Sequence, residues 1–98
     1  MAIYDVRAGT DDYLYVEVQA DILGHLNTRI VIPLMPLDVA PMPAGRLNPI
    51  ITVAGEPLSL VTQYLAAVRG STLGPVVGSV AHEHDRIGLA LDMLLKGY

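Results

Sequence analysis

The stretch from Tyr13 to Leu34 constrains the fold of this chain more than any other. From residue 13 to residue 21, apolar and mainly polar side chains alternate with the period of two that is typical of a strand buried on one face. Residues 29–34 form an almost continuous apolar run after the arginine, as expected where both faces of a strand are covered. We therefore predict two strands joined by a wide turn. The first of them buries Leu14, Val16, Val18 and Ala20.

The wide turn begins with two bulky apolar residues, Ile22 and Leu23, and continues through a polar segment around Gly24 and Asn27. Apolar side chains of this size gain free energy when they leave water. From the residues alone, two interpretations remain open. The pair either folds under the sheet or contacts a partner molecule.

Further strands are predicted on both sides of this stretch. Residues 2–6 predict a short strand that ends in a polar turn containing Gly9, so the first three strands form a meander. Residues 50–53 and 58–62 flank Ala54-Gly55-Glu56-Pro57 and predict a hairpin.

The segments between these elements and the C-terminus are less regular. Residues 35–48 contain three prolines and show no helical or strand period, so we predict a long loop. A loop of this length is either functional or an irregular connection across the end of a barrel. Residues 63–67 fit a helical turn or a bend, and residues 68–73 predict a strand that resumes at 76–77.

Only the C-terminal segment predicts a helix. Ser79 is the candidate N-cap, and Gly97 stands where a C-terminal cap glycine is expected. A second apolar pair, Leu89 and Met93, lies away from the main apolar stripe. Because one small sheet cannot cover both apolar faces of the helix, we expect the second face to be buried against another subunit or a partner protein. The main stripe consists of Ile87, Leu91, Leu94 and Leu95.

About five strands followed by one helix predict a mostly β fold, a strongly bent antiparallel sheet or SH3-like barrel with a C-terminal helix. The 98 residues support one domain over 1–98, which buries only about 60–65% of the unfolded surface. Hydrophobic residues make up 52% of the chain and charged ones only 16%, compared with the usual ~25% charged. A chain with this composition has more apolar surface than its small core can bury, so we expect a subunit interface.

The charge pattern speaks against several functions. The formal net charge is −4, and the six Lys and Arg residues are scattered without a basic stripe, so we expect no direct nucleic-acid binding by the protein itself. The absence of cysteine excludes disulfides and thiolate metal sites. The N-terminus lacks signal-peptide character, and no 18-residue apolar stretch occurs. A cytoplasmic protein without membrane contact is the expectation.

The segment His82-Glu83-His84-Asp85 is the one that most resembles a metal site. Residues two apart on a helix point about 200° away from each other, so His82 and His84 cannot share an ion there. Acidic residues in the first turn are better explained by the helix dipole. Because nucleophile-elbow and phosphate-loop motifs are also missing, we expect no enzyme, metal or cofactor.

Two motifs carry a resemblance to a known family. V-x-V-Q-x-D-I-L at residues 16–23 and R-x-V-I-P-L at residues 29–34 resemble the signature of the CcdB family of toxins from toxin–antitoxin modules. The similarity continues through Asn48-Pro49-Ile50-Ile51 and residues 62–73, and it ends with a helix followed by glycine and one last residue. It spans residues 4–98.

The resemblance implies an SH3-like barrel that forms a homodimer. It also implies an activity, in which the toxin dimer enters the dimerisation region of the A subunit of DNA gyrase, a type II DNA topoisomerase, and traps the enzyme with cleaved DNA. A cognate CcdA-like antitoxin would neutralise the toxin through a disordered segment that folds on binding. The two proteins together would repress their own operon and serve plasmid maintenance. The protein would thus inhibit an enzyme without being one.

The resemblance also assigns contact residues. Gyrase contacts are expected at the turn after the second strand and at the helix end, and antitoxin contacts at the first turn and the long loop. The best-known members end in an aromatic residue, glycine and an aliphatic residue, whereas this chain ends in Lys96-Gly97-Tyr98, which moves the aromatic ring to the last position. The gyrase set is Ile22, Leu23, Asp92, Leu95, Lys96, Gly97 and Tyr98. The antitoxin set is Arg7, Asp11, Asp12, Leu37, Met42, Arg46 and Leu47.

Two other functions compete with this hypothesis. An endoribonuclease of the related MazF and Kid type would need a positive groove and a convergent acid–base pair, and the acidic balance of this chain speaks against it. A non-toxic homologue that only binds antitoxin is suggested by the altered C-terminal tripeptide.

Overall fold

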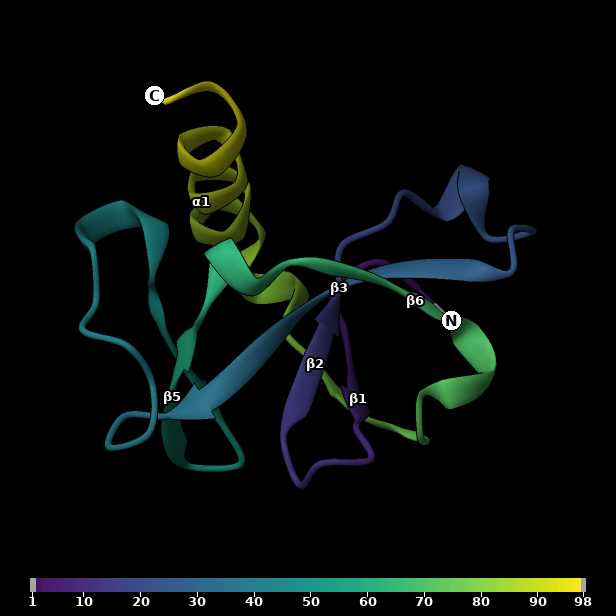
Figure 1. The fold of residues 1–98 in the computed structure, drawn as a ribbon, viewed down its shortest axis with the longest axis horizontal. Coiled ribbons are helices and arrows are strands. Elements are labelled where there is room, and N and C mark those ends of the chain that lie inside the picture. Colours follow the sequence, from purple (N-terminus) through teal and green to yellow (C-terminus); the bar gives the residue numbers. More distant parts are fainter. Residues whose placement is uncertain (1, 98) are drawn as a thin grey trace.

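The structure, a computed structural model, describes residues 2–97, which form seven β-strands and one α-helix (Figure 1). The strands are β1 (Asp5–Ala8), β2 (Leu14–Glu17), β3 (Thr28–Pro36), β4 (Ile50–Val53), β5 (Glu56–Leu60), β6 (Ala66–Arg69) and β7 (Val76–Ser79). Helix α1 spans His84–Lys96. Short 3-10 helices connect them: η1 (Asp21–Leu23), η2 (Gly45–Leu47), η3 (Thr62–Tyr64), η4 (Gly70–Thr72) and η5 (Ala81–Glu83).

The sheet is organised around β3, its longest strand among the described residues. All strand pairs are antiparallel, in the order β4-β5-β3-β2-β1-β7. One edge of β3 pairs with β2, and the other edge is shared, because β6 pairs with residues 28–31 and β5 with residues 34–36. Divided in this way, the sheet curls into a half-barrel. The predicted meander, the predicted hairpin and the mostly β fold with one C-terminal helix are confirmed.

The hydrophobic core lies between one face of this sheet and α1. Successive side chains of a strand point to opposite faces. Of the apolar set predicted from the alternation, Val16 lies in the core and Leu14 and Val18 pack against it, whereas Ala20 is exposed because β2 ends at Glu17. Helix α1 contributes Ile87 and Ala90 to this core, and both residues are fully buried. The buried strand residues of this cluster are Val6, Val16, Ile32, Leu34, Ile51, Leu58 and Leu60.

The opposite face of β1, β2 and β3 is also covered, which the alternation did not indicate. Glu17 is fully buried there between Arg7 and Arg29. The cover is the segment from β6 to β7: the carbonyl oxygen of Gly74 accepts a hydrogen bond from Nε of Arg7 at 2.7 Å. A Cβ on Gly74 would lie 2.9 Å from a backbone oxygen of Ala8, so only glycine allows this close approach.

Several predicted boundaries are wrong. The second strand of the predicted hairpin runs from Glu56 to Leu60 and not over 58–62. The first strand starts at Asp5 and not at residue 2, because Tyr4 has a left-handed backbone with a φ of 70°. Residues 70–72 turn as η4, so the strand predicted over 68–73 ends at Arg69. Residues 76–77 do not resume that strand but open β7, which pairs with β1.

The helix begins later than predicted. Ser79 lies in β7, where its hydroxyl oxygen accepts a hydrogen bond from the N–H of Ala81 at 3.2 Å, and α1 starts only at His84. The other end is confirmed: Gly97 is left-handed with a φ of 82°, and its N–H donates to the carbonyls of Asp92 and Met93. No helix within residues 2–97 has the length and apolar character needed to cross a bilayer.

Candidate partner-binding surfaces

The tip of the β2–β3 connection is an exposed apolar surface. Residues Asp21–Leu23 form η1, and 83% of Ile22 and 42% of Leu23 are accessible to solvent. Neither side chain belongs to the core cluster. Of the two interpretations that the sequence left open, packing of the pair under the sheet is therefore excluded, and the pair is free to contact a partner.

Two polar side chains of the V-x-V-Q-x-D-I-L motif hold this tip in place. The amide of Gln19 donates to the carbonyl of Leu23 at 2.9 Å and accepts from the N–H of Ile30 at 3.1 Å, so it ties the tip to β3. The carboxylate of Asp21 accepts from the N–H of Ile3 at 2.7 Å. The motif thus presents Ile22 on a fixed turn, since backbone bonds to residues 20 and 21 close the same turn.

The end of α1 is the second predicted gyrase contact. Leu95 is 71% exposed although it continues the predicted apolar stripe, because the helix extends beyond the sheet at this end (Figure 1). Nζ of Lys96 lies 3.5 Å from Oδ1 of half-buried Asp92, one helical turn earlier. Tyr98 lies outside the described residues.

The tip and the helix end do not form one surface within a protomer. Figure 1 shows both rising from the upper side of the molecule in that view, with η1 at the right and the end of α1 at the left. A partner that contacts both must therefore span the protomer, or it must contact the tip of one copy and the helix of another.

The predicted antitoxin residues are distributed over two regions. At the first turn, Asp11 and Asp12 are exposed, but Arg7 is only 8% exposed and is held by Glu17 and Gly74. A structural role for Arg7 therefore competes with the predicted partner contact. In the long loop, Leu37, Met42 and Arg46 are exposed and Leu47 is half-buried.

A hollow of about 310 Å³ separates this loop from the helix. Its lining includes Arg46 from the loop together with Arg86 and Leu89 from α1. It is the point at which the predicted antitoxin loop approaches the helix.

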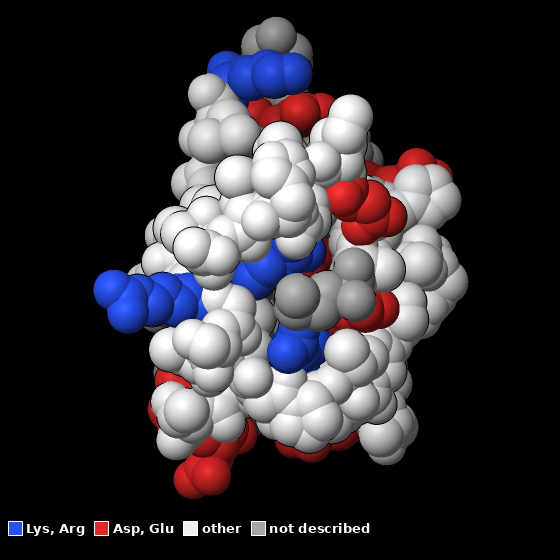
Figure 2. Space-filling model, turned by 90° about the vertical axis from the view of Figure 1, so that its right-hand side faces the viewer, with Lys and Arg blue, Asp and Glu red and all other residues white. Residues whose placement is uncertain are grey.

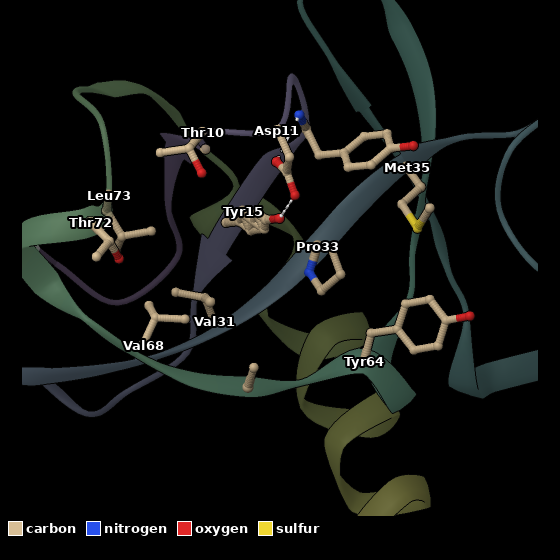
Figure 3. A pocket seen from close by; sticks show the side chains of 13 residues that line it. Thr10, Asp11, Tyr15, Val31, Pro33, Met35, Tyr64, Val68, Thr72 and Leu73 are labelled. Carbon is tan, nitrogen blue, oxygen red and sulfur yellow. Dashed lines mark hydrogen bonds between the residues drawn. The ribbon is translucent and has the colours of Figure 1, made fainter.

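A larger pocket of about 400 Å³ lies over the curled sheet, between the β1–β2 turn and β6 (Figure 3). Strand β3 contributes Val31, Pro33 and Met35 to it, which alternate with the core-facing residues of the same strand. In Figure 3, Val68, Thr72 and Leu73 stand on one side of the pocket and Tyr64 and Met35 on the other. The remaining lining residues are Gly9, Thr10, Asp11, Tyr13, Tyr15 and Ala66.

A hydrogen bond fixes the polar end of this pocket. The hydroxyl of Tyr15 donates to Oδ2 of Asp11, and the N–H of Tyr13 donates to Oδ1 at 3.2 Å. Burial, followed by the hydrogen bond and charge of Asp11, raises the pKa of Tyr15 to about 12. A Cβ on Gly9 would lie 2.8 Å from Oδ1 of Asp11 and 3.0 Å from the Tyr15 ring, so the turn packs tightly here.

The sequence did not identify this pocket, although it did identify Asp11. Its walls come from the β1–β2 turn, β3, η3, β6 and η4, which lie far apart along the chain. The only available signal was that three of the five tyrosines, Tyr13, Tyr15 and Tyr64, are among its lining residues.

Charged residues do not form a nucleic-acid track on the face shown in Figure 2. Lys and Arg residues stand there as separate patches, with uncharged surface and acidic residues between them. Within residues 2–97, no group of three or more His, Asp or Glu side chains is arranged to hold a metal ion. His84 instead contacts the carbonyl of Ala81 and the carboxylate of Asp85.

Comparisons with known proteins agree on the fold and identify the family. Two solved structures from mycobacterial species, an endoribonuclease in complex with its cognate antitoxin and an endoribonuclease, have TM-scores of 0.78 and 0.80. Each covers 97% of this chain, which covers 94% and 90% of theirs, at identities of 13% and 11%. Similarity at such low identity shows the fold alone. The family model described as CcdB protein matches residues 2–97, so the chain belongs to the CcdB family of toxins from toxin–antitoxin systems.

Proposed function

We propose that this protein is a gyrase poison, a toxin that binds the A subunit of DNA gyrase and traps the complex of the enzyme with cleaved DNA. The observation that carries the proposal is Ile22, which is 83% exposed on a turn braced by Gln19 and Asp21. An apolar side chain held rigidly in water contributes nothing to the core but is suited to insertion into a partner. It occupies the position at which the family resemblance places a gyrase contact.

The helix end supplies the second part of the proposed gyrase surface. Leu95 is exposed there, and the left-handed cap at Gly97 fixes the direction in which the chain leaves the helix. Lys96, which replaces the family's aromatic residue, pairs with Asp92. We assign the aromatic contact with gyrase to Tyr98.

We further propose that the active form is a homodimer. Leu89 and Leu95 leave apolar surface exposed on α1, and the tip and helix end of one protomer stand apart. A two-fold dimer would double both surfaces and cover part of the apolar helix. Sedimentation equilibrium should give twice the chain mass at micromolar concentration, and a monomer mass would contradict the dimer.

The remaining parts of the proposal concern regulation. A CcdA-like antitoxin neutralises the toxin through a segment that folds on binding, and the complex represses the operon. The exposed acidic turn and the exposed long loop support such contacts. Because gyrase acts on chromosomal DNA, the proposal places the protein in the cytoplasm.

Expression without antitoxin tests the proposal in cells. Induction should arrest growth and increase the amount of gyrase A subunit covalently attached to broken DNA. Growth arrest without these complexes would indicate a different target. Undisturbed growth would favour a non-toxic homologue that only binds antitoxin.

The endoribonuclease alternative is suggested by the two structural neighbours, which are both named as endoribonucleases. Its requirements are poorly met in this chain. Arg7 and Arg29 are buried and paired with Glu17, and Asp11 is the one charged residue that lines the larger pocket within the described chain. RNA chemistry needs exposed cations and a convergent acid–base pair. Site-specific cleavage of single-stranded RNA by the purified protein would support the endoribonuclease function instead.

A further inference from the structure

We propose that the pocket between the β1–β2 turn and β6 binds an arginine or lysine side chain, carried by an extended segment of the antitoxin with an aliphatic residue two positions away. The identity of this partner rests on the proposed function. The chemistry of the pocket does not, because it follows from the residues that line the cavity.

The charge at the pocket is negative and fixed in position. Asp11 accepts hydrogen bonds from the Tyr15 hydroxyl and the Tyr13 N–H. A carboxylate offers about four lone-pair sites on its two oxygens, so acceptor capacity remains for a bound cation. The tight packing at Gly9 holds the turn in this arrangement before a ligand arrives, so little ordering is required on binding.

The basic residues on the same face of the sheet keep one net positive charge, because two arginines share one glutamate, but this charge is buried outside the pocket. Arg7 and Arg29 are buried, both pair with Glu17, and neither lines the pocket. The next residue along the turn, Asp12, is exposed and adds a second negative charge close to Asp11. A cationic ligand is therefore favoured over an anionic one.

Aromatic rings complete the cation site. The lining includes Tyr13, Tyr15 and Tyr64, and the rings of tyrosine attract a guanidinium or ammonium group placed over their faces. The base of a nucleotide could also stack on such rings, but the phosphate of the nucleotide would be repelled by the negative charges of Asp11 and Asp12. The hydrocarbon stem of a long basic side chain instead suits the floor of Pro33 and the side chain of Met35.

The far side of the pocket defines a second side chain of the ligand. Val31, Val68 and Leu73 form an aliphatic wall opposite Tyr64 (Figure 3). Because successive side chains of an extended peptide point to opposite faces, a peptide that places its cation at Asp11 would bring the side chain two positions away to this wall. The predicted recognition element is thus one basic residue with valine or leucine two positions before or after it.

Two blocked pentapeptides test this chemistry on the full chain. Acetyl-Val-Ala-Arg-Ala-Val-amide and its citrulline counterpart have nearly the same shape but differ in charge. NMR titration of the amide signals of Gly9, Thr10 and Val68 should give a saturable shift with the arginine peptide. The citrulline peptide should bind about tenfold more weakly, the factor expected for loss of a charge-assisted contact.

Paired variants locate the binding energy. Asp11→Asn should weaken the arginine peptide about tenfold, whereas Asp38→Asn removes the same charge from an exposed turn outside the pocket and should have no effect. Tyr64→Phe keeps the ring and should bind like the natural protein, and Tyr64→Ala should bind more weakly. Equal binding of both peptides, equal effects of the two Asp variants, or no titratable shift would each overturn the cation site.

A competition experiment tests the proposed occupant separately. The protein saturated with its cognate antitoxin should no longer shift when the arginine peptide is added. If the antitoxin complex still binds the peptide, the pocket takes a cation but not from the antitoxin. Neither result depends on gyrase, so failure here is distinguishable from failure of the gyrase proposal.

Discussion

Arg29 and Glu17 form an ion pair in which Nε lies 2.6 Å from Oε1 and both side chains are fully buried. The second carboxylate oxygen of Glu17 lies 3.2 Å from Nη1 of Arg7. One carboxylate is therefore shared by cations from β1 and β3, and the three side chains together keep one net positive charge. Because both terminal nitrogens of Arg29 have no hydrogen-bond partner in the described structure, Glu17 is the group on which the buried charge of Arg29 depends.

Replacement of Glu17 by Gln should strongly destabilise the protein. The amide keeps the shape but leaves two guanidinium groups without their negative partner, and breaking a buried pair costs about 3–5 kcal/mol. Chemical denaturation at neutral pH measures the loss. Glu56→Gln, at the exposed start of β5, should change stability by less than about 0.5 kcal/mol. Similar losses in both variants would show that the buried pair contributes little.

Replacement of Ile22 by Asp should separate toxicity from stability. The side chain is almost fully exposed, so the unfolding free energy should change by less than about 0.5 kcal/mol. The charge would have to be desolvated in an apolar contact, so growth arrest should be lost. Val77→Asp is the matched control, since Val77 is an exposed apolar residue of β7, away from the tip. A toxic Ile22→Asp variant would remove the tip from the gyrase surface.

Removal of residues 96–98 should abolish toxicity while the fold persists. The deletion removes the left-handed cap at Gly97 and the exposed pair between Lys96 and Asp92, which together should contribute about 1 kcal/mol. Dimer formation and antitoxin binding should be retained, as measured by sedimentation and calorimetry. A truncated chain that still arrests growth would show that gyrase does not bind the C-terminal end.

The titration of Tyr15 should depend on Asp11. The folded protein holds the pKa of Tyr15 at about 12, above its ordinary value of 10.0. The folded state therefore binds more protons than the unfolded state between these values, and stability contributed by this group is full below pH 10 and falls as pH rises towards 12. Asp11→Asn should lower the pKa only part of the way, because burial is the largest cause. NMR titration of the tyrosine ring carbons measures it, and an unchanged value would contradict the assigned hydrogen bond.

The strands and the core could be predicted from the sequence because they depend on local periodicity. The alternation from Tyr13 to Asp21 assigned Val16 to the core correctly. The opposite face was not predictable, because alternation does not tell which distant segment covers Glu17. Gly74 makes that cover possible, since a Cβ there would lie 2.9 Å from the backbone oxygen of Ala8.

The candidate surfaces were predictable only where a motif marks them. The V-x-V-Q-x-D-I-L motif located the tip. The exposure of Ile22, however, follows from the hydrogen bonds of Gln19 and Asp21, and the motif contains these two residues without indicating their partners. The pocket around Asp11 is assembled from separate parts of the chain, so no spacing rule could identify it. The helix start was misplaced because Ser79 caps a turn as readily as a helix.

DNA cleavage by purified gyrase is the most direct measurement of the proposed activity. The enzyme, supercoiled plasmid and ATP are incubated with the protein at micromolar concentration, and the products are released with detergent and protease. Gyrase poisoning predicts linear DNA that accumulates with the natural protein but not with Ile22→Asp. Unchanged supercoiling with no linear DNA above background would contradict it.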